Sequence, residues 1–292
     1  MARGAGVEHL SRVHTLSFRV SMAVFPAATP VLLGVPFDAA SSFERGAAAA
    51  PHEIRRALRS AASNMWSEDL TDLGAAEAFG DAGDVSFLAD NPRHAIDQAV
   101  AAILNEAHRP LLLGGDHSIT FPAVAAVRRR HERLSILHFD AHNDLYDSFE
   151  GDRFSHACPF ARIMELGLCD ELVQVGVRAM TRHQQSQADR FGVEVIDMRR
   201  WVAGDRPRLA NPVYISLDID VLDPAFAPGV SHREGGGLST REVLTQLQAL
   251  RVPIVAADLV EYNPERDLDG ITSGICAKLL KELLAAMMRN PA

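Results

Sequence analysis

Short apolar runs that alternate with amphipathic segments constrain the fold of this chain most strongly. Runs such as Val31–Val35 and Leu134–Phe139 show no alternation of polar and apolar residues. Strands of that kind are buried on both faces, and strand–helix alternation is typical of parallel strands between two layers of helices. We therefore expect an α/β fold with a mostly parallel sheet. Further strands are expected over residues 110–113, 172–177, 193–196, 213–217 and 254–257.

Helices are expected between these strands. Pro51 suits the first turn of a helix over residues 52–61. Leu280 and Leu284 share one face of a final helix over residues 272–289. The other expected helices cover residues 92–107, 121–133, 182–191 and 239–250.

The length of 292 residues fits one large α/β domain, and no repeat, linker or charge run marks a second one. Residues 1–28 carry a few arginines and a short, broken apolar stretch, which is too weak a pattern for a targeting segment. We expect residues 1–28 to be a flexible N-terminal extension. Residues 29–292 are expected to form a single domain.

The amino-acid composition indicates which kinds of partner and which cellular compartment suit this protein. The formal net charge of −9 argues against nucleic acid or an anionic membrane as the main partner, since both require a basic face. No apolar run reaches the length of a transmembrane helix. The three cysteines, Cys158, Cys169 and Cys276, are sparse and lack metal-type spacing, which favours reduced thiols in the cytoplasm.

Three short runs rich in carboxylates and histidine each follow an expected strand. They are Gly114–Ser118, Asp140–Asp144 and Asp218–Pro224. Right-handed crossovers bring the carboxyl ends of parallel strands to one edge of the sheet, where such folds bind their ligands. The three runs are therefore expected to meet at one site.

The spacing within the runs favours a metal site. Asp140, His142 and Asp144 are alternate residues, which point the same way in extended backbone. Asp218 and Asp220 repeat that spacing, and another strand contributes the sixth ligand, His117. Such a ligand set suits two harder or borderline divalent ions, with Mn²⁺ preferred over Zn²⁺, Co²⁺ or Ni²⁺. Two neighbouring ions can share a water and lower its pKa, so we expect a dinuclear metal hydrolase.

Neighbouring residues have simpler interpretations. Asp116 is interpreted as a helix cap or a support for a ligand, and Asp223, before a proline, as turn chemistry. His138 lies in an apolar strand and is expected to be a packed core histidine. Ser118 and Cys158 lack an evident base, so covalent catalysis is disfavoured.

The three runs resemble motifs of the ureohydrolase family, which includes agmatinases, arginases and guanidinobutyrases. A fourth matching motif is Asp258–Pro264, and the similarity extends from Leu33 to near the carboxyl terminus. The resemblance implies a three-layer α/β/α fold with a parallel sheet of about eight strands, as in arginases and the related deacetylases. It also implies two Mn²⁺ ions per chain, a small cationic guanidino substrate and assembly into homotrimers or hexamers. The implied reaction releases urea and an amine.

The resemblance also assigns roles to individual ligands. It implies that His117 and Asp144 bind one ion and that His142 and Asp220 bind the other. The bridging ligands would be Asp140 and Asp218.

Two further residues gain roles from the resemblance. Glu261 matches a carboxylate that receives the guanidinium group through paired hydrogen bonds. His156 matches a histidine near the leaving group, where an imidazole can donate or carry a proton.

The substrate is less constrained. Tyr146 stands where arginases carry an asparagine that holds the amino-acid carboxylate, so agmatine is expected rather than arginine, with Tyr146 in the substrate site. Arg233 replaces a family proline and could meet the carboxylate of 4-guanidinobutyrate. The neighbouring His232 has no assigned role, so the choice between agmatine and 4-guanidinobutyrate stays open. Outside the ureohydrolases, the alternatives are a deacetylase-like amidohydrolase with a single zinc ion and an inactive metal-binding scaffold.

Overall fold

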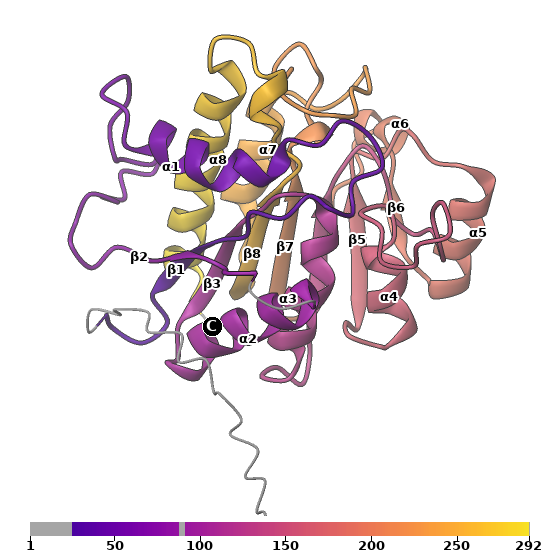
Figure 1. Ribbon diagram of the computed structural model, residues 1–292, viewed down its shortest axis with the longest axis horizontal. Helices are drawn as coiled ribbons and strands as arrows, with labels where there is room; N and C mark the ends of the chain where they lie inside the picture. Colours follow the sequence, from indigo (N-terminus) through magenta and orange to yellow (C-terminus); the bar gives the residue numbers. More distant parts are fainter. Residues whose placement is uncertain (1–24, 88–90, 292) are drawn as a thin grey trace, which may run out of the picture.

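The computed structural model describes residues 25–87 and 91–291, which form one sheet of eight parallel strands. The spatial order is β2-β1-β3-β8-β7-β4-β5-β6, and Figure 1 shows the labelled strands in this order from β2 at the left to β6 at the right. The strands are β1 (Pro30–Gly34), β2 (Gly80–Asp84), β3 (Arg109–Leu113), β4 (Ser135–Phe139), β5 (Glu171–Val175), β6 (Glu194–Ile196), β7 (Val213–Asp218) and β8 (Ile254–Val260).

Helices cover both faces of the sheet, and each face has its own apolar core. One layer contains α1 (Ala50–Leu58), α6 (Met198–Val202), α7 (Thr240–Ala249) and α8 (Ile271–Arg289). The other contains α2 (Pro92–Asn105), α3 (Thr120–Arg128), α4 (Pro159–Glu165) and α5 (Arg182–Phe191). Short 3₁₀ turns lie at Ala47–Ala49, His117–Ile119, Ile219–Val221 and Pro264–Arg266. The three-layer α/β/α prediction is thus confirmed.

Every strand expected from an apolar run is present. Three elements were not expected: the edge strand β2 and the short helices α4 and α6. The predicted first helix, over residues 52–61, is found as α1 and begins two residues earlier, with Pro51 in its first turn.

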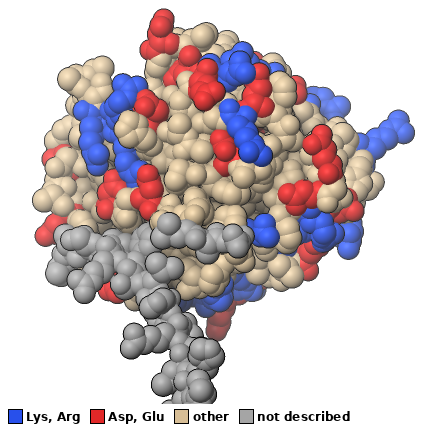
Figure 2. All heavy atoms as spheres, in the orientation of Figure 1, with Lys and Arg blue, Asp and Glu red and all other residues tan. Residues whose placement is uncertain are grey.

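The chain ends and the surface bear on the other predictions. Residues 1–24 of the predicted extension lie outside the described residues, whereas Phe25 packs edge-on against His108, with ring centroids 6.3 Å apart. The domain boundary after residue 28 stays a prediction. In the described ranges no helix is long and apolar enough to cross a membrane. On the face shown in Figure 2, acidic and basic side chains are interspersed.

The four central strands position the functional motifs. In sequence β3, β4, β7 and β8 are far apart, but in the sheet β3, β8, β7 and β4 are consecutive neighbours. Gly115 follows β3 and lies so close to the chain that a Cβ there would stand 1.8 Å from the carbonyl oxygen of Phe37. A glycine is therefore required where the chain turns towards His117.

Candidate metal centre

The structure brings all six predicted metal ligands together beyond the carboxyl ends of β3, β4 and β7. His117 Nδ1 lies 3.1 Å from a carboxylate oxygen of each of Asp140, Asp144 and Asp218. The ring is fully buried, and Nδ1 has no hydrogen-bond partner among residues 25–87 and 91–291. A buried nitrogen that faces three carboxylates without a hydrogen bond is suited to a cation between them.

A second group of ligand atoms lies on the other side of Asp140. His142 Nδ1 is 3.2 Å from Asp140 Oδ1 and 3.0 Å from Asp220 Oδ2. The two oxygens of Asp140 thus face different histidines, Oδ2 towards His117 and Oδ1 towards His142. This is the arrangement required of a carboxylate that bridges two ions.

The spacing of these atoms matches that of a shared coordination sphere. Two atoms that bind one ion at about 2.1 Å and at right angles lie about 3.0 Å from each other. The distances around His117 and His142 are 3.0 to 3.2 Å. The residues present therefore fit divalent cations, and the geometry favours two separate positions.

Electrostatics also favours cations here. Burial and the neighbouring carboxylates raise the pKa of Asp218 well above its ordinary value, and burial raises the pKa of Asp220. Burial opposes the ionised form of Asp140 as well, but His138 beside it lowers its pKa well below the usual range. So many carboxylates in one buried space are stable in ionised form only with compensating positive charge.

A buried chain of hydrogen bonds fixes the ring of His117. Its Nε2 lies 2.9 Å from Ser216 Oγ, and Ser216 donates its own hydrogen to Asp258 Oδ1 at 2.7 Å. Since Ser216 has a single hydrogen to give, it accepts from His117 Nε2–H. Nδ1 is then the unprotonated nitrogen and carries a lone pair for a cation. Asp258 also accepts from Tyr214 at 2.6 Å and from Thr120 at 2.7 Å.

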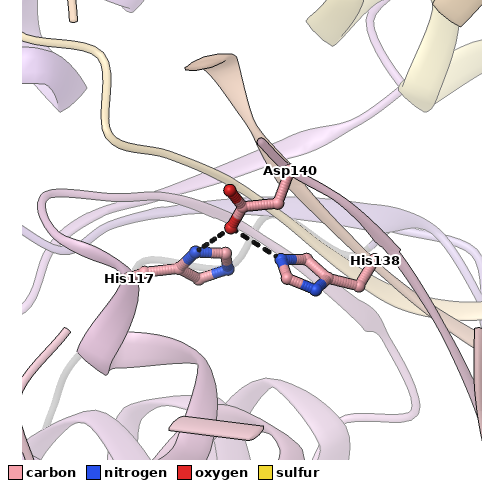
Figure 3. A group of neighbouring side chains, drawn as sticks. All are labelled: His117, His138 and Asp140. Atoms are coloured by element: carbon pink, nitrogen blue, oxygen red, sulfur yellow. Dashed lines mark hydrogen bonds and ion pairs between the residues drawn. The ribbon is translucent and has the colours of Figure 1, made fainter. Parts of the chain in front are cut away.

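His138 is the packed core histidine that the sequence predicts, and it also supports a ligand. Figure 3 shows His117 and His138 on either side of the same Asp140 oxygen, with His138 Nε2 at 2.8 Å. Gln174 Nε2 donates to His138 Nδ1 at 2.9 Å, so Nε2 carries the hydrogen that Asp140 accepts. Both ring nitrogens are engaged, and the ring stacks on Phe160 at 3.9 Å. His138 therefore orients Asp140 instead of binding an ion.

His156 and Glu261 form a pair at the wall of the site. His156 Nδ1 donates to Glu261 Oε1 at 3.0 Å, and Ser42 Oγ lies 2.9 Å from His156 Nε2. Burial disfavours the charged imidazole, but Glu261 outweighs it and raises the pKa of His156 to about 9. Burial likewise favours neutral Glu261, yet the bond with His156 lowers its pKa. At neutral pH the pair is ionic.

Backbone strain marks two residues of the site. Asp144 and Glu261 have φ angles of 47° and 62°, in the left-handed region that side chains other than glycine rarely adopt. The backbone N–H of His117 donates to Glu261 Oε1 at 2.8 Å, and the N–H of Glu261 donates to the carbonyl of Gly115 at 2.9 Å. These bonds hold Glu261 in place despite its strained conformation.

A cavity of about 160 Å³ opens over the ligands, with Glu261 and His156 in its lining. Tyr146, which the sequence places in the substrate site, lies in the wall of this cavity, stacked on His183 with centroids 5.7 Å apart. Five residues of the lining were not assigned to the site from the sequence: Ser42, Phe149, Ala157, Ala179 and Gln184. His232, whose role was left open, also lies in the lining. No lysine or arginine of the described ranges lines it.

The other singled-out residues lie outside the cavity lining. Asp116 accepts from the N–H of Ser118 and caps the turn that carries His117, as predicted. Asp223 accepts from three backbone N–H groups of its own turn region, at residues 225, 236 and 237. Arg233 donates to the carbonyls of residues 228 and 266. Burial raises the pKa of the Cys158 thiol to about 12, so this thiol is unreactive.

Comparison with known proteins identifies the family. The arginase family profile matches residues 28–286. The chain is 46% identical to the mitochondrial arginase of Medicago truncatula, over 90% of this chain and 83% of that protein. It is 32% identical to an agmatinase of Bacillus subtilis, over 93% of this chain and 96% of that one. It is 33% identical to a guanidinobutyrase of Pseudomonas aeruginosa, over 98% and 94%.

Solved structures agree with this result. The arginase of Medicago truncatula matches with a TM-score of 0.85 at 46% identity, over 89% of this chain and 88% of that one. The chain belongs to the arginase family, as its motifs predicted. It is a metal-dependent hydrolase of C–N bonds in guanidino compounds.

Proposed function

We propose that this protein hydrolyses L-arginine to L-ornithine and urea at a dinuclear manganese centre. The observation that carries the proposal is the 46% identity to a plant arginase, against 32% and 33% to an agmatinase and a guanidinobutyrase. The sequence alone favoured agmatine because of Tyr146, but these relatives do not support that preference.

In this proposal the ligands keep the roles that the family resemblance implies. His117 and Asp144 would hold one ion, His142 and Asp220 would hold the other, and Asp140 and Asp218 would contribute to both. The contacts of His117 with three carboxylates and of His142 with two support this division. When bound, the ions would activate a shared water for attack on the guanidinium carbon.

Glu261 and His156 complete the proposed chemistry. Glu261 Oε1 is occupied by His156 and by a backbone N–H, while its Oε2 accepts no hydrogen bond within the described part of the chain. Oε2 is therefore open to an N–H of the guanidinium group. His156, cationic at neutral pH and anchored at Nδ1, would give a proton to the leaving amine.

Agmatine is the second candidate substrate. The observation in its favour is the absence of lysine and arginine from the described lining of the cavity, since agmatine carries no carboxylate. For 4-guanidinobutyrate, Arg233 was one candidate partner for the carboxylate, but its guanidinium group is bonded to backbone carbonyls.

The test is urea release by manganese-loaded protein from arginine, agmatine and 4-guanidinobutyrate. Arginine is expected to give the highest kcat/KM, by about tenfold or more. A higher kcat/KM for agmatine would reject the proposal in favour of an agmatinase. One ion per chain with amide cleavage would indicate a deacetylase-like enzyme, and two ions without urea an inactive scaffold.

We also propose a cytoplasmic location and a homotrimeric or hexameric assembly. The support for the location is that Cys158, Cys169 and Cys276 are all free thiols. Cell fractionation and light scattering of the purified protein test the two proposals separately.

A further inference from the structure

Arginine differs from agmatine by one carboxylate, so an enzyme that selects arginine must offer hydrogen-bond donors to that anion. Several polar groups in the lining of the cavity are unsuited to this role. Asp144, Asp218 and Asp220 repel an anion, and both ring nitrogens of His156 are engaged, one by Glu261 and the other by Ser42. A neutral donor in the lining can supply the contact instead.

Gln184 at the start of α5 has such a donor. This residue lines the cavity and is only 2% exposed. Its Oε1 accepts from the backbone N–H of Thr181 at 2.9 Å and from Thr181 Oγ1 at 3.0 Å. In return, Thr181 Oγ1 accepts from the N–H of Gln184, which completes a capping box.

These bonds fix the orientation of the Gln184 amide. A backbone N–H can only donate, so the end of the amide that faces Thr181 is the oxygen. The NH₂ group is then directed away from the cap. It makes no hydrogen bond to residues 25–87 or 91–291, and its nitrogen is not among the buried atoms that lack a partner. It is therefore a pre-oriented donor that the cavity can reach.

The surroundings of Gln184 also suit an anion. Helix α5 has ten residues, and the positive end of its dipole lies at its first turn. The ring of Tyr146 stacks on His183, the residue before Gln184, at an interplanar angle of 14°. The first turn of α5 and Tyr146 therefore form one wall of the cavity.

We infer that Gln184 Nε2 donates a hydrogen bond to the α-carboxylate of arginine and thereby selects arginine over agmatine. The inference rests on the proposed function and names the residue that sets its specificity. The amide that Tyr146 replaces in the sequence comes instead from α5.

The test is the substitution Gln184→Glu in the manganese-loaded enzyme. Glutamate is common at this position of a capping box and keeps the oxygen that Thr181 requires, but it replaces the donor by a second carboxylate oxygen. We expect kcat/KM for arginine to fall about 10- to 100-fold, mainly through KM, while kcat/KM for agmatine changes less than about twofold. Gln184→Met, which removes the donor without adding charge, should lower arginine kcat/KM by about tenfold.

Gln185→Glu is the matched control, since it makes the same change one residue further on an exposed side chain. It should leave both substrates unchanged. Equal losses for arginine and agmatine in Gln184→Glu would show a structural role and overturn the inference, as would unchanged arginine kinetics. Wild-type protein that releases no urea from arginine would instead refute the proposed function together with this assignment.

Discussion

Ser216 is the residue that leaves a single nitrogen of His117 available to a cation. It accepts from His117 Nε2–H and passes its own hydrogen to Asp258. Residues that orient a ligand in this way commonly change metal affinity by about 10- to 100-fold when they are removed. Ser216→Ala is therefore expected to weaken manganese binding by that factor, measured by titration of metal-free protein.

Ser135 provides a matched control for that experiment. It is a buried serine at the amino end of β4, the end away from the metal site, and it donates to Glu171 at 2.7 Å. Ser135→Ala should leave manganese affinity unchanged. Full affinity in Ser216→Ala would show that the ring of His117 is held by other contacts.

His156 gives the metal-free protein a defined pH dependence. Its pKa rises on folding from an ordinary 6.5 to about 9, because the carboxylate of Glu261 outweighs burial. A raised folded pKa stabilises the fold fully below pH 6.5, and this contribution is lost as pH rises through about 9. The loss amounts to about 3 kcal/mol, since one pKa unit corresponds to about 1.4 kcal/mol.

The measurement is the free energy of unfolding of wild-type and His156→Ala protein from pH 6 to 10, with chelator present. The wild-type advantage should shrink across that range. A constant difference between the two proteins would mean that the ion pair with Glu261 is absent in solution.

At the scale of elements, Arg109 joins the last helix to the sheet. From the start of β3 its Nη1 donates to the carbonyls of Ile254 at 3.0 Å and Met287 at 2.6 Å, and its Nε donates to Ala28 at 2.7 Å. Burial lowers its pKa to about 10, so the group is still charged at neutral pH. It neutralises the negative end of α8, where backbone carbonyls lack partners within the helix.

Arg109→Met should therefore destabilise the protein without touching the chemistry. The loss is expected to be about 2–4 kcal/mol, because buried carbonyls lose charged donors. Denaturant unfolding measures this loss. The value of kcat should not change, since Arg109 is at the amino end of β3 and the site lies beyond the carboxyl ends of the strands. Arg129→Met removes an exposed arginine as the control and should cost under about 0.5 kcal/mol. A large change in kcat for Arg109→Met would contradict this separation.

The elements that the sequence predicts are those whose own residues determine them. Strands such as β4 and β7 are apolar throughout, and their burial on both faces follows from that pattern. The edge strand β2 contains Gly80 to Asp84 with a single alanine, so no local signal marks it. It is held by β1 and by Arg55, which donates to Asp81 at 2.9 Å and Asp84 at 2.5 Å. Those contacts come from distant segments.

The same distinction applies to the site. The metal-ligand motifs could be predicted from the sequence, because their alternate spacing at a strand end places Asp140, His142 and Asp144 together. The inferred role of Gln184 in substrate selection could not be predicted from the sequence, because it depends on how α5 packs against the loop that follows β4. Its only local signal is Thr181 three residues earlier, the spacing of a capping box.

At the scale of the whole molecule, the sheet gathers negative charge from distant parts of the chain into one buried space. Asp140, Asp218 and Asp220 come from β4 and β7 and the turns that follow them, and Asp116 and Glu261 follow β3 and β8. Burial, with Glu261 nearby, raises the pKa of Asp116 to about 7. The parallel topology that builds the site therefore makes the metal-free fold electrostatically unfavourable.

Removal of the ions should accordingly lower stability in a pH-dependent way. The pKa values of Asp116, Asp218 and Asp220 are raised on folding. Above these pKa values the three carboxylates are ionised and destabilise the fold, and this destabilisation decreases as pH falls through the pKa values. Metal-free protein should therefore become more stable from pH 8 to pH 6. Manganese at about 100 times its Kd should add about 2.7 kcal/mol per ion.

Calorimetric unfolding with chelator and with manganese, at pH 6, 7 and 8, measures both effects. The gap in Tm between the two forms should be widest at pH 8, where the carboxylates are most fully ionised. Magnesium in place of manganese tests whether general screening by a divalent ion suffices, since it binds histidine poorly. Equal Tm values for the chelated and manganese-loaded forms at pH 8 would mean that the converging carboxylates hold no ion.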